Sequence, residues 1–230
     1  MRFRKLHPWP HTMEEARAIQ EELRRALSLR PPGSSFRLVA GADISYPRFG
    51  RRAVGGVVVV CLPEFEPVEE QFFEGEMHFP YVPGYLTFRE GPILAEAFAR
   101  LRHRPDVVLF DGQGIAHPRG LGLAAHLGLY LGLPAVGCAK SLLYGKAGEP
   151  GPERGSWSPI WGGGGEVIGA ALRTRAGVKP LYVSPGHRMD LSTAITLALA
   201  ASPRYRLPEP LRLAHRRTNE IRRASGVCGP

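Results

Sequence analysis

The chain has 230 residues, of which 43% are hydrophobic and 22% are charged. This composition is typical of a globular protein and excludes a chain too polar to form a core. No run approaches the roughly 18 apolar residues that a membrane-spanning helix needs. The first 20 residues contain no apolar stretch of the kind found in signal peptides.

Basic residues outnumber acidic ones, 30 to 21, and the formal net charge is +9. Most are arginines, whose planar fork suits phosphate groups. The charge favours a polyanionic partner such as a nucleic acid, and a solvated basic surface is an equal alternative. The cysteines, Cys61, Cys138 and Cys228, match no zinc-binding spacing. We expect Cys61 and Cys138 to be buried thiols of a cytoplasmic protein.

The first half of the chain predicts one helix and three strands. Apolar residues recur at helical spacing over residues 13–29, and prolines at 31 and 32 end this pattern. Strand-like runs follow at residues 37–46, 53–62 and 68–77. Because only short turns separate these runs, we expect them to form an antiparallel meander.

The second half alternates helices with buried strands. The predicted helices cover residues 87–101, 120–131, 189–201 and 211–223, and the predicted strands cover residues 106–111, 133–141, 165–174 and 180–186. The expected fold is therefore α/β, with a mixed sheet of three antiparallel strands followed by parallel strands, flanked by helices. We expect a single domain over residues 1–230, with a Gly/Pro-rich surface loop at about 144–165 and a basic C-terminal helix and tail.

Two aspartates occupy unusual places in these strands. Asp43 lies inside the apolar run VAGADISY, and Asp111 ends the run PDVVLFD. If the two strands are neighbours, both carboxylates can reach one cation, without which they would repel each other. Oxygen ligands favour Mg²⁺, for which Mn²⁺ can substitute. The alternatives are an exposed edge-strand residue for Asp43 and a turn residue before Gly112 for Asp111.

Three further polar residues lie close to these strands in the sequence. Glu90 is either a third carboxylate of the site or the capping-box partner of Thr87 at a helix start. His117 is either a catalyst or a hydrogen-bonded structural histidine. Lys140 ends the apolar run LPAVGCAK, where it would bind phosphate or stabilise developing charge, unless it is an ordinary exposed lysine.

The stretch PYVP, residues 80–83, predicts a stiff loop that carries an aromatic ring. Pro80 and Pro83 hold Tyr81 and Val82 in an extended conformation. A ring on such a loop can enter a base stack and help a base to leave the duplex. The alternative is that Tyr81 packs on the core.

These motifs together resemble the endonuclease V family, which acts on inosine. The similar runs, in chain order, are GADISY, PYVPGYLTFRE, PDVVLFDGQGIAHPRGLGLAAHLG, VGCAKSLL, PLYVSPGHRMDLSTA and LPEPLRLAH, and they extend over about residues 36–217. The resemblance implies an RNase H-like fold with a five-stranded core sheet. It also implies Mg²⁺-dependent hydrolysis of the second phosphodiester bond 3′ to a deoxyinosine, which leaves 3′-hydroxyl and 5′-phosphate ends.

The resemblance assigns roles to individual residues. It implies metal ligation by Asp43 and Asp111, with Glu90, Lys140 and His117 as further catalytic residues. Wedge and DNA contacts are implied for Tyr81 with Pro80, Val82 and Pro83, and more loosely for His215. For the lesion pocket we expect backbone contacts at glycines that allow close approach, namely Gly84, Gly112 and Gly137.

Three statements about partners follow. The expected partner is deoxyinosine-containing DNA, with no membrane, and the expected state is a monomer. One alternative is an inosine-specific endoribonuclease of the same family, which would bind inosine-containing RNA. The other is a non-catalytic nucleic-acid-binding protein of the RNase H-like class.

Overall fold

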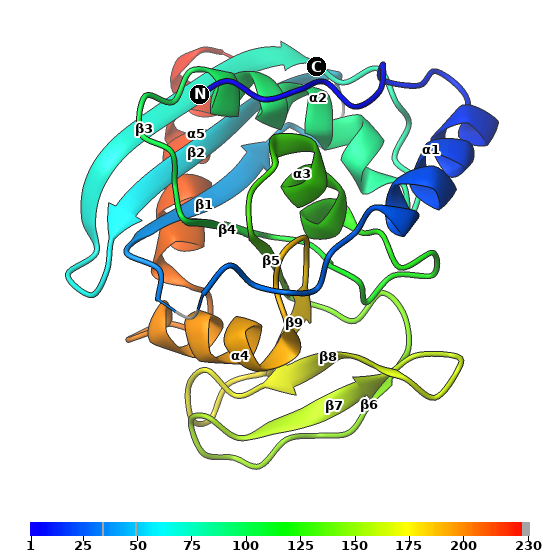
Figure 1. Ribbon diagram of the computed structural model, residues 1–230. Helices are drawn as coiled ribbons and strands as arrows, with labels where there is room; N and C mark the ends of the chain where they lie inside the picture. Colours follow the sequence, from blue (N-terminus) through cyan, green and yellow to red (C-terminus); the bar gives the residue numbers. More distant parts are fainter. Residues whose placement is uncertain (34, 49, 227–230) are drawn as a thin grey trace.

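The computed structural model describes residues 1–33, 35–48 and 50–226 (Figure 1). Its helices are α1 (Met13–Arg25), α2 (Leu86–Ala99), α3 (Leu123–Leu131), α4 (Leu191–Ala200) and α5 (Glu209–Ala224). Its strands are β1 (Leu38–Ser45), β2 (Arg52–Cys61), β3 (Glu66–Glu76), β4 (Val107–Phe110), β5 (Ala135–Ala139), β6 (Lys146–Ala147), β7 (Trp157–Trp161), β8 (Val167–Leu172) and β9 (Leu181–Pro185). None of these helices is long and apolar enough to cross a membrane.

One mixed sheet joins all nine strands in the order β3-β2-β1-β4-β5-β9-β8-β7-β6. Strands β1, β2 and β3 form the predicted antiparallel meander, and β4 pairs in parallel with both β1 and β5. The α/β class and the mixed sheet are therefore confirmed, with the strand order of an RNase H-like fold. The five-stranded core sheet is β3-β2-β1-β4-β5, and the antiparallel strands β9, β8, β7 and β6 extend it beyond β5.

The Gly/Pro-rich segment at residues 144–165 is only in part the loop that its composition predicts. It contains β6 and β7, which pair with each other, and β7 also pairs with β8. Ile160 of β7 is fully buried against Ala116 and Ile168. Packing against the sheet therefore outweighs the poor strand propensity of this segment.

Several helix ends also differ from prediction. Helix α1 ends at Arg25 rather than at residue 29. Helix α2 begins at Leu86 after Tyr85, so Thr87 lies inside the helix and is not its N-cap. Helix α3 begins only at Leu123, because Gly120 has a positive φ of 65° that no α-helix accommodates.

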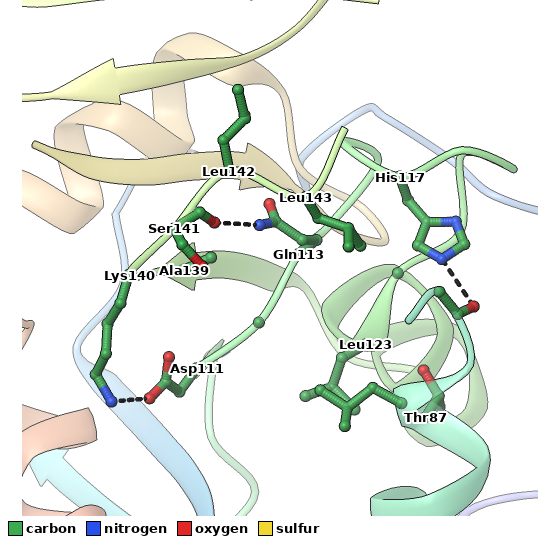
Figure 2. A pocket seen from close by; sticks show the side chains of 14 residues that line it. Thr87, Asp111, Gln113, His117, Leu123, Ala139, Lys140, Ser141, Leu142 and Leu143 are labelled. Carbon is green, nitrogen blue, oxygen red and sulfur yellow. Dashed lines mark hydrogen bonds and ion pairs between the residues drawn. The ribbon is translucent and has the colours of Figure 1, made fainter. Parts of the chain in front are cut away.

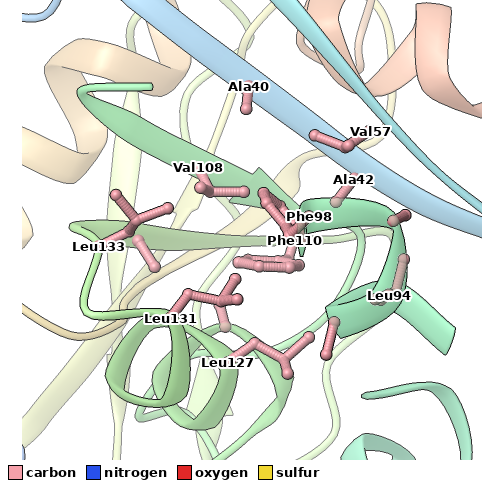
Figure 3. Packing of buried hydrophobic residues seen from close by; sticks show 14 of the residues in the cluster. Ala40, Ala42, Val57, Leu94, Phe98, Val108, Phe110, Leu127, Leu131 and Leu133 are labelled. Atoms are coloured by element: carbon pink, nitrogen blue, oxygen red, sulfur yellow. The ribbon is translucent and has the colours of Figure 1, made fainter. Parts of the chain in front are cut away.

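Helices cover both faces of the sheet and enclose two main cores. Helices α2 and α3 cover one face, where Phe98 and Leu127 pack on Phe110 and its neighbours (Figure 3). Helices α4 and α5 cover the other face. Cys138 is buried there as expected, and burial raises the pKa of its thiol, whereas Cys61 is only half-buried. Cys228 lies outside the described residues.

Two glycines allow α5 to lie very close to the sheet. A Cβ atom on Gly41 of β1 would lie 2.2 Å from the carbonyl carbon of Pro210 at the start of α5. A Cβ atom on Gly56 of β2 would lie 2.6 Å from the side-chain methyl of Thr218. Only glycine fits at such separations, so these two positions determine how closely α5 approaches β1 and β2.

We expect Gly41→Ala to lower the free energy of unfolding by about 2 kcal/mol or more, because the added methyl group must displace the backbone of α5. Denaturant unfolding measures this change. Gly33→Ala is the matched control, since no atom lies within 4 Å of a Cβ atom at Gly33. Equal stabilities of the two variants would contradict the close contact between α5 and β1.

Candidate active site

The parallel pairing of β1 with β4 brings Asp43 and Asp111 to the same level of the sheet. The register pairs Ala42 with Phe110, and each aspartate is the next residue in its strand direction. The Asp43 side chain is 10% exposed and that of Asp111 is 22% exposed. Strand β1 lies between β2 and β4, so the edge-strand alternative for Asp43 is wrong.

Glu90 of α2 is the third carboxylate at this place. It is buried, and burial together with the charges of Asp43 and Asp111 raises its pKa to about 8. The hydroxyl of Tyr46 donates to its Oε1 atom over 3.4 Å. The capping-box alternative is wrong, because no side chain caps the start of α2.

Two basic side chains contact the aspartates. The Lys140 ammonium group donates to Oδ2 of Asp111 (Figure 2), although burial still raises the pKa of this carboxyl group. His215 of α5 donates from Nδ1 to Oδ2 of Asp43 over 2.8 Å, and this bond raises the pKa of the imidazole. Thr218 also donates to this oxygen, over 3.5 Å. His215 therefore lies beside the carboxylates rather than at the Tyr81 loop.

The three carboxylates lie together without the arrangement of a metal-binding cluster. Among the residues that the structure describes, no group of three or more His, Cys, Asp or Glu side chains is arranged to hold a metal ion. Asp43 and Asp111 instead hold hydrogen bonds to His215 and Lys140. Burial is the largest cause of the raised pKa of Glu90, and the charges of Asp43 and Asp111 add to it. All three acidic groups offer oxygen, the ligand atom that Mg²⁺ prefers.

A cavity of about 320 Å³ opens beside Asp111 and Lys140 (Figure 2). Its other lining residues are Gly84, Leu86, Thr87, Gly112, Gln113, His117, Gly122, Leu123, Ala139, Ser141, Leu142 and Leu143. This volume is in the range of small-molecule sites. Gly84 and Gly112 line the cavity as predicted. Gly137 does not, because a Cβ atom there would lie 2.4 Å from the backbone nitrogen of Gly114, so Gly137 packs beneath that loop.

His117 is buried in the wall of this cavity with both ring nitrogens occupied. Its Nε2 atom donates to the carbonyl of Gly84 over 2.9 Å, and its Nδ1 atom accepts from the backbone N–H of Arg119 over 3.1 Å. Burial lowers the pKa of His117 to about 4, so the ring is neutral. These contacts are those of a hydrogen-bonded structural histidine, which was the alternative to a catalyst. The residue positions the Gly84 carbonyl.

The loop at residues 80–83 is held at both ends while its tip is exposed. At one end, Arg89 donates to the carbonyl of Phe79 over 2.8 Å. At the other end, the Gly84 carbonyl accepts hydrogen bonds from Gln20, His117 and Arg119. The tip residue Tyr81 is 65% exposed, so the alternative that it packs on the core is wrong. Pro80 and Pro83 are also exposed, and Val82 is half-buried.

A second, basic pocket of about 450 Å³ adjoins the first one. The charged residues in its lining are Lys140, Glu149, Arg173, Lys179 and Arg206. Lys140 lines both pockets, and its carbonyl accepts from the Arg206 guanidinium over 2.6 Å. Arg206 also donates to the carbonyl of Pro180 over 2.7 Å. The positive lining of this pocket thus continues directly from the carboxylate site.

The sequence argument missed several residues that contact the site. Thr218 could have been found, since it follows His215 by three positions on a helix and shares its face. Gln113 lies within the DGQG motif, and its amide N–H donates to the Ser141 carbonyl over 2.8 Å. No sequence signal identifies Tyr46 as the partner of Glu90, because only the packing of α2 against the end of β1 brings them together.

The family model, a related sequence and a related structure all indicate the same protein family. The family model of endonuclease V matches residues 21–216. The endonuclease V of Myxococcus xanthus is 52% identical over 219 residues, which are 95% of this chain and 93% of that protein. The crystal structure of the Bacillus subtilis enzyme is 33% identical with a TM-score of 0.92, over 98% of this chain and 99% of its own.

A third relative was solved with a nucleic acid. The endonuclease V of Ciona intestinalis, in complex with a 24mer DNA containing an inosine followed by a ribo-adenosine, is 29% identical to this chain. Its TM-score is 0.80, and the match covers 93% of this chain and 98% of that structure.

We expect the metal-free protein to lose stability as the pH rises because of Glu90. The ordinary pKa of this group is 4.5, and it is about 8 in the folded protein, so the folded state holds the proton more tightly. This stabilisation is fully present below pH 4.5 and is lost as the pH rises to about 8. Thermal unfolding in EDTA should show the melting temperature falling across this window, and Glu90→Gln should remove most of the fall.

Glu96→Gln is the control for this measurement, because Glu96 lies on the exposed side of the same helix. It should keep the wild-type dependence on pH. Parallel profiles for wild type and Glu90→Gln would show that the three carboxylates do not interact as described.

Proposed function

Because the chain belongs to the endonuclease V family, we propose that it is a DNA repair endonuclease that recognises deoxyinosine. It hydrolyses the second phosphodiester bond 3′ to the lesion in a Mg²⁺-dependent reaction, leaving 3′-hydroxyl and 5′-phosphate ends. The observation that supports this most is the meeting of Asp43, Glu90 and Asp111 beside a cavity whose lining includes Gly84, the residue that follows the exposed Tyr81 loop. A carboxylate cluster next to a base-sized pocket and a wedge suits cleavage close to a flipped nucleotide.

Asp43 and Asp111 are the residues that would hold Mg²⁺, and Glu90 would join them directly or through water. When bound, the cation polarises the scissile phosphate and lowers the pKa of a water molecule. The chain supplies the remaining groups. Lys140 places a positive charge beside Asp111, where it would stabilise negative charge that builds up on the phosphate. His215 orients the Asp43 carboxylate through the bond to Oδ2.

The cavity would receive the flipped hypoxanthine. Gly84 and Gly112 let the base approach the backbone closely, so the base can be recognised by peptide groups. His117 would support this pocket by holding the Gly84 carbonyl, and both of its ring nitrogens are engaged in hydrogen bonds. Inosine pairs weakly, so extruding it from a duplex costs less than extruding a normal base.

Tyr81 would fill the space that the flipped base leaves in the stack. Both ends of its loop are hydrogen-bonded to buried groups, so the ring is presented in one place. The basic pocket around Lys179 and Arg206 would follow the backbone away from the scissile phosphate. The net charge of +9 agrees with such a footprint.

An inosine-directed ribonuclease is the second candidate. The Ciona complex supports it, because a ribonucleotide follows the inosine in the strand bound to that relative. Discrimination between the two sugars needs only a few contacts to the 2′-hydroxyl group. Both candidates use the same carboxylates, so the substrate rather than the site distinguishes them.

We expect Asp43→Asn and Asp111→Asn each to lower cleavage by at least about 100-fold while leaving the fold intact. The assay compares a duplex with one deoxyinosine, its undamaged twin and a single-stranded inosine RNA, each with Mg²⁺ or with EDTA. A Mg²⁺-dependent nick at the second linkage 3′ to the lesion, in the damaged DNA alone, supports the proposal.

Three other outcomes of this assay are informative. Cutting of the RNA alone would support the second candidate. Tight binding of inosine DNA by the wild type without any cutting would indicate a non-catalytic binding protein. Full activity of Asp111→Asn would contradict the assignment of the metal site.

Tyr81→Ala should weaken binding of the inosine duplex by about tenfold, because one stacking contact to a base is lost. The cleavage rate at saturating protein should fall less, since Tyr81 does not contact the carboxylates. Tyr205→Ala is the control, because this tyrosine is also exposed but lies in a different pocket. If both variants bind as tightly as wild type, Tyr81 is not the wedge.

A further inference from the structure

A chain of hydrogen bonds leads from the end of α5 to Asp43. Arg222 donates from Nε to the Ser45 hydroxyl over 2.8 Å, and Ser45 donates to Oδ1 of Asn219 over 2.8 Å. The Asn219 amide group then donates to the His215 carbonyl over 2.7 Å and faces Nε2 of the ring over 3.3 Å. His215 completes the chain with its bond to Asp43. We call Arg222, Ser45, Asn219 and His215 the Asn219 relay.

The chemistry of the side chains determines which group donates and which accepts in each hydrogen bond of the Asn219 relay. A guanidinium can only donate hydrogen bonds, so the Ser45 hydroxyl accepts from Arg222. Ser45 then donates its own proton to the side-chain oxygen of Asn219. The Asn219 oxygen therefore faces Ser45, which leaves the NH₂ group for the ring of His215. The NH₂ group of Asn219 can only donate, so Nε2 of His215 must be unprotonated and accept the hydrogen bond. The ring proton then lies on Nδ1 and faces Asp43.

Local geometry explains why these side chains meet. Ser45 follows Asp43 by two positions on β1, so both side chains lie on the face that α5 covers. Asn219 follows His215 by four positions on α5 and lies on the same side of the helix. Ser45 is buried and Asn219 half-buried, whereas the His215 side chain is 53% exposed, so water competes least for the bonds at the Ser45 end.

The Asn219 relay includes residues that lie beyond the stretch matched by the family model. The family model ends at residue 216, so neither Asn219 nor Arg222 belongs to the matched stretch. Both lie on α5, which the close contacts at Gly41 and Gly56 hold against the sheet. The end of α5 is thus connected to the Asp43 carboxylate by two hydrogen bonds, from Asn219 to His215 and from His215 to Asp43.

We propose that Asn219, supported by Ser45 and Arg222, is a positioning residue that holds His215 with its Nδ1 proton on Asp43. This orientation keeps the Asp43 carboxylate aimed at the place where the cation of the proposed nuclease reaction would bind. Partners of this kind, which orient a metal-binding carboxylate or histidine, typically change metal affinity or activity by about 10- to 100-fold when they are removed. The effect on Mg²⁺ rests on the proposed function, whereas the orientation of the ring does not.

The decisive variant is Asn219→Asp, which keeps the shape of the side chain and replaces the donor by an acceptor. Nitrogen-15 NMR of histidine-labelled, metal-free protein at alkaline pH reports which ring nitrogen carries the proton, and His215→Gln identifies the signal. We expect wild-type Nε2 to be unprotonated and Nε2 of Asn219→Asp to be protonated. Ser45→Ala tests the relay independently. This variant should give a mixture of His215 rings with protonated and with unprotonated Nε2.

Arg223→Ala is the matched control on the exposed side of α5, and it should leave the His215 signal unchanged. In cleavage assays, Asn219→Asp should raise the Mg²⁺ concentration for half-maximal rate about tenfold, with an unchanged KM for DNA. An identical His215 signal in wild type, Asn219→Asp and Ser45→Ala would overturn the proposal. Since the NMR measurement needs no activity, a wild type that fails to cut DNA would disprove the nuclease function and leave the relay standing.

Discussion

The hydrogen bonds between β1 and β4 pair Val39 to Ala42 with Val107 to Phe110, and the position of every other group at the site depends on this register. Parallel strands end at the same edge of a sheet, so a carboxylate just beyond each paired segment meets its counterpart there. A slip by one residue would turn one aspartate to the opposite face, because side chains alternate along a strand. The buried apolar residues on both faces of these strands prevent such a slip.

Helix α5 adds the second constraint. Because Gly41 and Gly56 carry no side chain, the helix lies close enough for His215 and Thr218 to reach Asp43. A larger residue at either glycine would move both side chains together, since they share one rigid helix. The packing of α5 therefore determines the surroundings of the carboxylates, because Gly56 pairs directly with Asp43 across the sheet and Gly41 lies two residues before it.

Sequence reasoning succeeded where a local pattern determined the outcome and failed where tertiary contacts did. Asp43 and Asp111 could be predicted because each interrupts or ends an apolar strand, and parallel strand ends share an edge. Glu90 remained ambiguous, because a capping-box residue and a site carboxylate occupy the same position at a helix start, and only burial distinguishes them. Nothing in the sequence indicates the contacts of Asn219, because they form only when α5 packs on β1. The composition of residues 144–165 was misleading, because pairing across the sheet imposed strands on a Gly/Pro-rich segment.

The Tyr81 loop exposes an aromatic ring on a backbone that is held by hydrogen bonds at both ends. The Gly84 carbonyl is buried and accepts three side-chain donors, while the Phe79 carbonyl is held by Arg89. Leaving such backbone groups without partners would cost about 1–3 kcal/mol each, so these bonds oppose any opening of the loop. The two prolines restrict the residues in between. In the wedge role that we propose, a loop whose backbone is already held in place loses less conformational entropy on insertion, so more of the stacking energy remains available for binding. Tyrosine suits an exposed position better than phenylalanine, since its hydroxyl group can be hydrated, and its ring keeps an apolar face for the base stacking that we propose.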